Sequence, residues 1–161
     1  MKTLALSVAA VWAALATCPA RAAEDMPLQR LALCQDSWLD WKNDDARMAR
    51  LVNSFESGFT RGAEGAFTPK SALSVLGHPV TSVYPQSVGM GVGFSLVVQA
   101  GFAETRAAIE KQLGKPMACS TSEGTRSCEL EIGARRTAVL MTGQNGLAKS
   151  SLVGCYYFYQ Q

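Results

Sequence analysis

The cysteines are the side chains in this sequence whose types and spacing could support chemistry. In the stretch CSTSEGTRSC, Cys119 and Cys128 lie at equal distances from Glu123-Gly124. A two-residue turn at Glu123-Gly124 places the two cysteines opposite each other on antiparallel strands, where Cβ atoms come close to disulfide distance. A redox centre is better served by Cys-x-x-Cys, and a zinc site needs at least two more ligands than this hairpin offers. The sequence therefore predicts a structural Cys119–Cys128 disulfide.

Two further cysteines, Cys34 and Cys155, follow the N-terminal segment. An even number of cysteines after Cys18 favours two bridges, because disulfides persist in exported proteins. Pairing Cys34 with Cys155 would tie an N-terminal helical segment to the last strand of the chain. Four cysteines allow three pairings, so this second pairing is an inference from geometry and stays open.

One histidine and two carboxylates are the other candidates for chemistry. His78 is the single histidine, and the stretch TPKSALSVLGHP predicts a short helix over residues 68 to 77 with His78 at its exit, beside the last helix carbonyls. A two-residue turn at Gly133-Ala134 would put Glu129 and Glu131 on one outer face. With Arg136 then opposite Glu131, a solvated ion pair is favoured over an acid-base pair. The chain has no Gly-x-Ser-x-Gly nucleophile elbow. These residues favour a protein that is not an enzyme, without deciding the point, and they predict no catalytic site, metal or cofactor.

Residues 88 to 99 alternate with a period of two, which is typical of a β-strand. One face carries large apolar side chains, including Met90, and is predicted to meet the core, while the opposite face begins with three glycines. Glycines inside a strand are tolerated where a backbone, an aromatic ring or a ligand comes close. They therefore predict a shallow trough, either covered by an aromatic side chain of a neighbouring strand or open to a partner. In the last strand, SLVGCYYFYQQ, a core-facing Cys155 directs two aromatic residues outward. The predicted interaction surface comprises Gly89, Gly91, Gly93, Tyr156 and Phe158.

The elements that position these residues follow from the apolar pattern. Large apolar side chains at steps of three and four predict a helical face between residues 31 and 59, as one kinked helix or as two with a cap at Asn43-Asp44-Asp45. A connecting helix is predicted over 102 to 113, ended by Gly114 and Pro116. Strands are predicted over 117 to 122, 125 to 132, 135 to 142 and 151 to 159, in addition to the glycine strand. The helical face comprises Leu31, Cys34, Trp38, Trp41, Met48, Val52, Phe55 and Phe59.

These elements define the predicted fold class. It is α+β, with an N-terminal helical segment and one connecting helix packed on a mainly antiparallel sheet of about five strands, held by two disulfides. A single domain is predicted over residues 24 to 161, with a helical part at 27 to 77 and a sheet part at 80 to 161. About 138 residues are enough for one core.

The N-terminus has the three parts of a secretory signal peptide. Lys2 is followed by an apolar run over residues 4 to 16 and by the small-x-small site Ala20-Arg21-Ala22, so residues 1 to 23 are predicted to be removed. Lipid attachment at Cys18, which would leave the protein membrane-anchored, is the alternative. No later segment is apolar over the roughly 20 residues that a bilayer core requires. The predicted location is the periplasm if the source is a Gram-negative bacterium, and secretion otherwise.

Charge excludes one class of partner. Without Lys2 and Arg21, the 15 basic residues become 13, equal to the 13 acidic ones, so the mature chain is formally neutral. It lacks the electrostatic attraction that supplies most non-specific nucleic-acid affinity. Nucleic acid is therefore not an expected partner.

Function is inferred from the classes that remain. The sequence favours an exported, non-catalytic protein-interaction module of the cell envelope, of the adaptor, inhibitor or immunity type, that binds another envelope or secreted protein. The alternative is a carrier of a small apolar ligand between helix and sheet, which a cavity lined by Trp38, Trp41 and Met90 would favour. A hydrolytic enzyme is third, and a cleft that gathers His78 with Glu129 or Glu131 would favour it.

Overall fold

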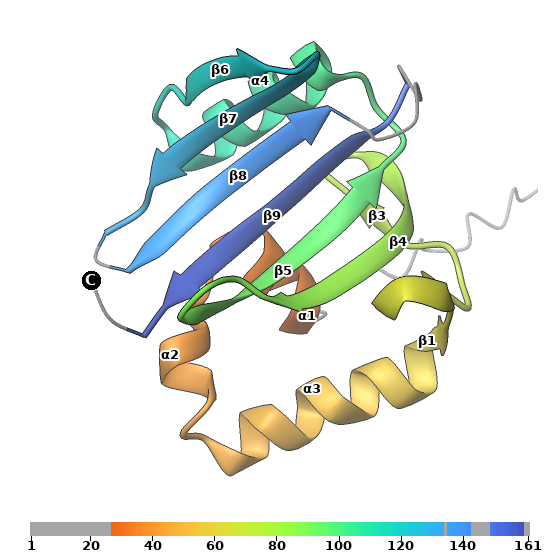
Figure 1. The fold of residues 1–161 in the computed structure, drawn as a ribbon. Helices are drawn as coiled ribbons and strands as arrows, with labels where there is room; N and C mark the ends of the chain where they lie inside the picture. Colours follow the sequence, from red (N-terminus) through yellow and green to blue (C-terminus); the bar gives the residue numbers. More distant parts are fainter. Residues whose placement is uncertain (1–26, 134, 143–148, 160–161) are drawn as a thin grey trace, which may run out of the picture.

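A computed structural model describes residues 27–133, 135–142 and 149–159 of the chain (Figure 1). The predicted signal peptide, residues 1 to 23, and the alternative lipidation site Cys18 lie outside these residues. None of the described helices is long and apolar enough to cross a membrane.

The N-terminal segment forms three short helices instead of one or two: α1 (Pro27–Ala32), α2 (Trp38–Trp41) and α3 (Asp45–Gly58). Helix α1 ends because Cys34 adopts a left-handed backbone conformation, with φ of 55°. Asp44 caps α3, since its side chain accepts a hydrogen bond from the backbone N–H of Arg47. The two breaks change the phase of the apolar stripe. Val52, predicted to be buried, is 48% exposed, and Leu51 takes its place in the core.

The sheet is antiparallel and larger than predicted, with nine strands in the described residues instead of about five. The five predicted strands correspond to β5 to β9. The other strands come from residues 59 to 87, where no individual strand is predicted and residues 80 to 87 are assigned only to the sheet part. The spatial order is β1-β2-β4-β5-β9-β8-β7-β6, with β3 beside β4 (Figure 1). The strands are β1 (Phe59–Arg61), β2 (Phe67–Pro69), β3 (Ser74–Val75), β4 (His78–Ser87), β5 (Gly91–Val98), β6 (Ala118–Ser122), β7 (Thr125–Glu131), β8 (Arg136–Thr142) and β9 (Ser151–Phe158).

The helix predicted over residues 68 to 77 is not formed. Leu76 and Gly77 both have positive φ, 55° and 81°, and they join Val75 to His78 as a tight β-hairpin. Two consecutive left-handed residues are the hallmark of a type I′ turn. Glycine followed by proline ends helices and shapes turns alike, and here it belongs to a turn. His78 therefore begins β4 and does not lie at a helix exit.

The hairpin between β7 and β8 has a register one residue away from the predicted one. Glu131 pairs with Thr137, and the N–H of Ile132 donates to the carbonyl of Arg136 at 2.8 Å, so the connection is longer than two residues. Arg136 thus does not face Glu131. Its side chain lies on the opposite face of the sheet, where it donates to the backbone carbonyl of Asp36 at 3.2 Å. The predicted ion pair between Glu131 and Arg136 is wrong for this reason.

The connecting helix α4 (Phe102–Leu113) has the predicted bounds. Gly114 ends it with φ of 68°, in the left-handed conformation that suits a helix C-terminus. Ile109 is buried, and Phe102 and Leu113 pack against the core as predicted.

Helices lie on one face of the sheet and enclose the core (Figure 1). Trp38 of α2 packs on Phe94 of β5, with ring centroids 5.3 Å apart. Both predicted disulfides are confirmed. Cys34–Cys155 ties the end of α1 to the central strand β9, and Cys119–Cys128 joins β6 to β7.

Candidate functional site

The face of the sheet that points away from the helices, called the outer face below, carries the predicted interaction surface. No described helix crosses this face, which is turned toward the viewer in Figure 1. Directly paired residues of antiparallel strands point to the same side, so the pairing of Gly93 with Tyr156 and of Gly91 with Phe158 brings these residues together. Three rows of side chains cross the outer face from β7 to β4: Glu131, Thr137, Tyr156, Gly93 and Gln86; Glu129, Val139, Gly154, Ser95 and Tyr84; Ser127, Met141, Leu152, Val97 and Ser82.

Atoms of β9 fill the space beside the glycines of β5, where a side chain would otherwise lie. A Cβ at Gly93 would lie 2.6 Å from Cδ1 of Tyr156, so the tyrosine ring covers this glycine. A Cβ at Gly91 would meet the backbone carbonyl of Tyr157. The trough is therefore filled by an aromatic side chain at Gly93 and narrowed by backbone at Gly91, which is the covered alternative that the sequence left open.

Three residues of the predicted strand, Val88, Gly89 and Met90, lie in the turn before β5. Gly89 has φ of 55°, and the carbonyl of Gly91 accepts a hydrogen bond from the N–H of Val88 at 3.1 Å. Met90, predicted to face the core, is 65% exposed because it lies in this turn. The alternation of residues 88 to 99 holds only within β5 itself, and Gly89 belongs to the turn beside the surface.

Tyr156 is held in place across the outer face by polar contacts. Gln86 Nε2 lies 3.3 Å from the Tyr156 hydroxyl and 3.4 Å from Ser95 Oγ, so the three side chains link β4, β5 and β9. Burial raises the pKa of the Tyr156 hydroxyl above its ordinary value of 10, against the lowering effect of these hydrogen bonds, and the Glu129 carboxylate raises it further. The hydroxyl therefore stays protonated at neutral pH, and Tyr156 presents a fixed aromatic surface with a polar tip.

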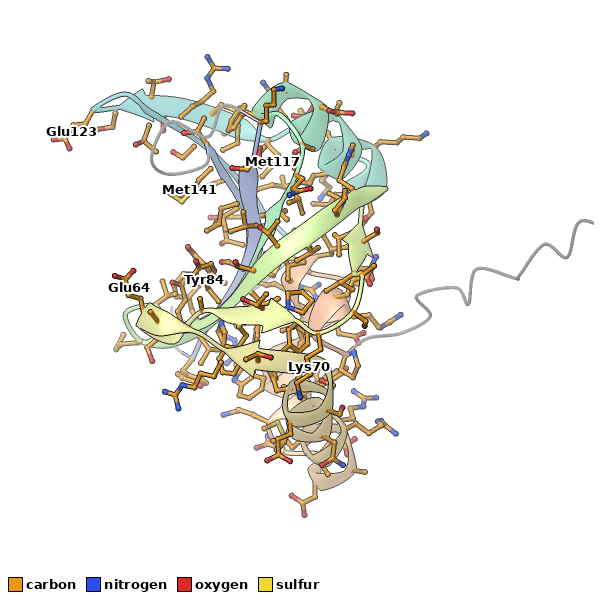
Figure 2. The ribbon with its side chains drawn as sticks, turned by 90° about the vertical axis from the view of Figure 1, so that its right-hand side faces the viewer. Glu64, Lys70, Tyr84, Met117, Glu123 and Met141 are labelled. Atoms are coloured by element: carbon orange, nitrogen blue, oxygen red, sulfur yellow. A yellow bond between two sulfur atoms is a disulfide. The ribbon has the colours of Figure 1, made fainter. Side chains whose placement is uncertain are left out.

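Around Tyr156 the outer face is apolar in its centre and acidic on one side. The apolar side chains are partly exposed, and Tyr84 and Met141 are seen in Figure 2 on the side of the molecule opposite the helices. Glu129 and Glu131 are exposed on β7, where they pair with Val139 and Thr137 at the β7 end of two of the rows. Glu64 of η1 (Ala63–Gly65) and Glu123 of the β6–β7 turn extend to the same side at its two ends (Figure 2). The central apolar residues are Tyr84, Val97, Met141, Leu152, Tyr156 and Phe158.

The residues considered for catalysis are not brought together. Nε2 of His78 lies 3.6 Å from Oε1 of Glu104 on α4. Strand β4 is four strand positions from β7, which carries Glu129 and Glu131, a distance of roughly 19 Å at about 4.8 Å per strand. Within the described residues, no group of three or more histidine, cysteine or acidic side chains could hold a metal ion. The carboxylates of β7 and the histidine of β4 therefore cannot share one cleft.

A recess that the sequence did not indicate lies between α4 and the edge strand β6. Its volume is about 330 Å³. Its lining residues are Phe102, Ala103, Arg106, Cys119, Ser120, Thr121 and Arg126.

No protein-family model, curated protein or solved structure matches the chain. Function is therefore argued from two features of the structure itself, the outer face and the recess beside β6.

Proposed function

We propose that the chain is an exported, non-catalytic protein-interaction module of the cell envelope, of the adaptor, inhibitor or immunity type, and that it binds its partner through the outer face of the sheet. The observation that carries this proposal is the group of partly exposed apolar side chains around Tyr156 on a face that no described helix crosses. Rigid aromatic residues in such a setting contribute most of the binding energy of many protein interfaces.

The geometry of Tyr156 supports a role in binding. Its ring rests on Gly93 and its hydroxyl is held by Gln86, so little side-chain entropy remains to be lost when a partner covers it. Phe158, one row further along β9, is partly exposed beside Gly91. Together with Leu152 and Met141 these residues offer an apolar centre with the polar rim that is typical of interfaces.

The charge of the rim favours a particular kind of partner. Glu129 and Glu131 are exposed on the β7 side of the apolar centre. We expect the partner, another envelope or secreted protein, to carry basic side chains at the edge of its own apolar patch, because complementary charge guides association. Nucleic acid is not the expected partner, since the mature chain is formally neutral.

Export is supported by the two disulfides, which persist in oxidising compartments. The predicted signal peptide then gives a mature protein in the periplasm if the source is a Gram-negative bacterium, or a secreted one otherwise, with lipid anchoring at Cys18 as the alternative. The carrier function gains no support, because Trp38 packs directly on Phe94 and Met90 lies in an exposed turn.

The test is capture of partners from envelope extract by the mature, oxidised protein, followed by affinity measurement with the captured protein. Replacing Tyr156 and Phe158 together by Ala should weaken binding by on the order of a hundredfold, which corresponds to about 2.8 kcal/mol for the pair. His78→Ala, a substitution far from the outer face, is the matched control and should leave affinity unchanged. Unaltered affinity in the folded double variant, or a loss only in the His78 variant, would contradict the proposal.

A further inference from the structure

Strand β6 is the last strand on one side of the sheet, and within the described residues it pairs only with β7 (Figure 1). The direction of its backbone groups follows from the hairpin. Glu123 and Gly124 both have positive φ, as in a type I′ turn, which makes Ser122 and Thr125 a hydrogen-bonded pair. Hydrogen-bonded and non-hydrogen-bonded pairs alternate along antiparallel strands, so Cys119 and Thr121 belong to non-hydrogen-bonded pairs. Their backbone N–H and C=O groups therefore point away from β7.

The disulfide gives independent support for this alternation. The Cα atoms of Cys119 and Cys128 are 4.0 Å apart, which matches a non-hydrogen-bonded pair at about 4.5 Å and not a hydrogen-bonded one at about 5.5 Å. The backbone N–H and C=O groups of Cys119 and Thr121 are thus directed to the free edge of the sheet.

Among the residues that the structure describes, this edge lacks the usual protection against pairing. Natural sheets guard their edges with lysine, proline, bulges or covering segments. Strand β6 has the sequence ACSTS, every residue of it is exposed, and its pairing with β7 is regular from Ala118 to Ser122. The Cys119–Cys128 bridge holds the strand in its paired position. The edge is therefore a rigid template for one more strand.

The recess of about 330 Å³ lies alongside this edge, between β6 and α4. Phe102 forms an apolar part of its lining, and two arginines, Arg106 and Arg126, supply positive charge. The guanidinium of Arg106 is already bound, 2.8 Å from Oε1 of Glu110 and 3.3 Å from the carbonyl of Met117. That of Arg126 stacks over the Phe102 ring, 5.2 Å from its centroid.

Arg126 is the cation of this recess that has no carboxylate within 4.0 Å among the described side chains. Stacking on an aromatic face leaves the N–H donors in the guanidinium plane available, and these donors suit a carboxylate in a bidentate arrangement. The edge thus combines unpaired backbone groups, an aromatic surface and an available cation.

We propose that the groove between α4 and β6 binds an extended peptide segment, which adds to the sheet as a strand beside β6 and places an acidic side chain against Arg126. Backbone groups of Cys119 and Thr121 pair with the segment, and Phe102 contacts an apolar side chain two positions from the acidic one, since alternate residues of a strand share a face. This surface is separate from the outer face, so the inference extends the proposed protein-binding function and does not depend on the outer-face site.

The test uses the oxidised, ¹⁵N-labelled protein and two peptides blocked by acetyl and amide groups, acetyl-Thr-Val-Thr-Glu-Thr-Val-amide and the same peptide with Gln for Glu. Titration should shift the amide signals of residues 118 to 122 and of Phe102 and Arg126. The Glu peptide should bind about fivefold to tenfold more tightly than the Gln peptide, because a charge-assisted hydrogen bond is about twice as strong as a neutral one.

Three variants separate the contributions. Arg126→Gln should abolish the preference for Glu, whereas Arg50→Gln, which removes an exposed cation of α3, should preserve it. Thr121→Pro removes an edge-facing N–H that β7 does not use, so it should weaken both peptides without unpairing β6. The Tyr156→Ala/Phe158→Ala variant should bind both peptides as the wild type does, which distinguishes this groove from the outer face.

Several results would overturn the inference. They are shifts that omit residues 118 to 122 at millimolar peptide, equal affinity for the two peptides, or binding that survives Thr121→Pro. Tighter binding of an unblocked Gln peptide than of the blocked Glu peptide would identify a C-terminal carboxylate as the ligand instead. Concentration-dependent shifts of β6 without peptide would identify a second copy of the chain. If Thr121→Pro does not fold, the peptide comparison and the Arg126 variant decide.

Discussion

Removing each disulfide separately should have unequal effects on stability. Cys34 and Cys155 are 121 residues apart in the chain, and Cys119 and Cys128 are 9 apart. In the chain-entropy model a bridge stabilises by restricting the unfolded chain, with an entropy that grows with the logarithm of the loop length. This gives about 5 kcal/mol for the long loop and about 2.5 kcal/mol for the hairpin at 25 °C.

The structure adds to this difference. Cys34 and Cys155 are both buried, at 3% and 0% exposure, so replacing both by Ala also removes two packed sulfur atoms from the core. In the hairpin bridge only Cys128 is buried, and Cys119 is exposed. We therefore expect the Cys34→Ala/Cys155→Ala variant to lose at least about 2 kcal/mol more than the Cys119→Ala/Cys128→Ala variant.

Urea unfolding of the oxidised variants, followed by tryptophan fluorescence, measures this difference. Trp38 and Trp41 lie in the helical segment that the Cys34–Cys155 bridge anchors, so their emission reports its release. The slopes of unfolding free energy against urea should be compared first, because a changed slope would indicate an altered unfolded state. Equal losses, or a larger loss for the hairpin variant, would refute the loop-length reasoning.

Three further substitutions test the packing that positions the outer face. Gly91→Ala should lower the free energy of unfolding by about 1 to 3 kcal/mol, because the new Cβ meets the carbonyl of Tyr157, whereas Gly58→Ala meets no atom within 4 Å and should not destabilise; equal urea midpoints would contradict this. Tyr157→Phe removes a buried hydroxyl that donates to the backbone carbonyls of Leu31, at 2.6 Å, and Asp36, at 2.9 Å. It should lower the free energy of unfolding by about 1 to 3 kcal/mol. An unchanged midpoint of thermal unfolding would argue against these hydrogen bonds. The hydrogen bonds from Arg30 hold the pKa of Asp36 below its ordinary value of 3.8. The stabilisation from this ion pair is therefore present above that pH and is lost as the pH falls through the lower pKa of the folded state. In urea unfolding, Asp36→Asn should reduce the loss of stability between about pH 5 and 2, and an unchanged pH dependence would exclude this pair as its source.

The part of the fold that the sequence predicts well is the part with regular periodicity and short connections. Strands β5 to β9 and helix α4 have apolar patterns of normal length, and the Glu123-Gly124 turn fixes the register of its hairpin, which made the Cys119–Cys128 pairing predictable. The register predicted from a Gly133-Ala134 turn is wrong by one residue, because Arg135 adopts φ of 63° and extends the connection. Arginine rarely adopts this left-handed conformation, so the sequence does not indicate it.

Residues 59 to 87 could not be predicted in the same way. Strands β1 to β3 have only two or three residues, too few to show a period. Strand β4 is interrupted by an irregularity between Val80 and Ser82 and contains two prolines, which argue against a strand. Pro85 is tolerated because β2 pairs with β4 only at Val83, so the edge beside Pro85 is not needed for pairing, whereas Pro79 lies opposite Ser74 in the short hairpin with β3.

The sequence predicts the face of the sheet on which the candidate surface lies, but not the contacts within that surface. Alternation in β5 and the core-facing Cys155 place the glycines and the two aromatic residues on one face. That Tyr156 covers Gly93 depends on the register between β5 and β9, which lie about 60 residues apart in the chain and are aligned by the core and not by a turn. The recess beside β6 depends likewise on how α4 packs, which no local pattern records.

Site-directed photo-crosslinking in the native compartment tests the central claim most directly. A benzoyl-phenylalanine at Tyr84, on the outer face, replaces one aromatic side chain by another (Figure 2). The same group at Val52, which is 48% exposed on α3 on the helical side, is the matched control. We predict a discrete crosslinked partner at Tyr84 that is absent at Val52 and is lost when Tyr156 and Phe158 are replaced by Ala. A partner captured equally at both positions, or at Val52 alone, would contradict binding through the outer face.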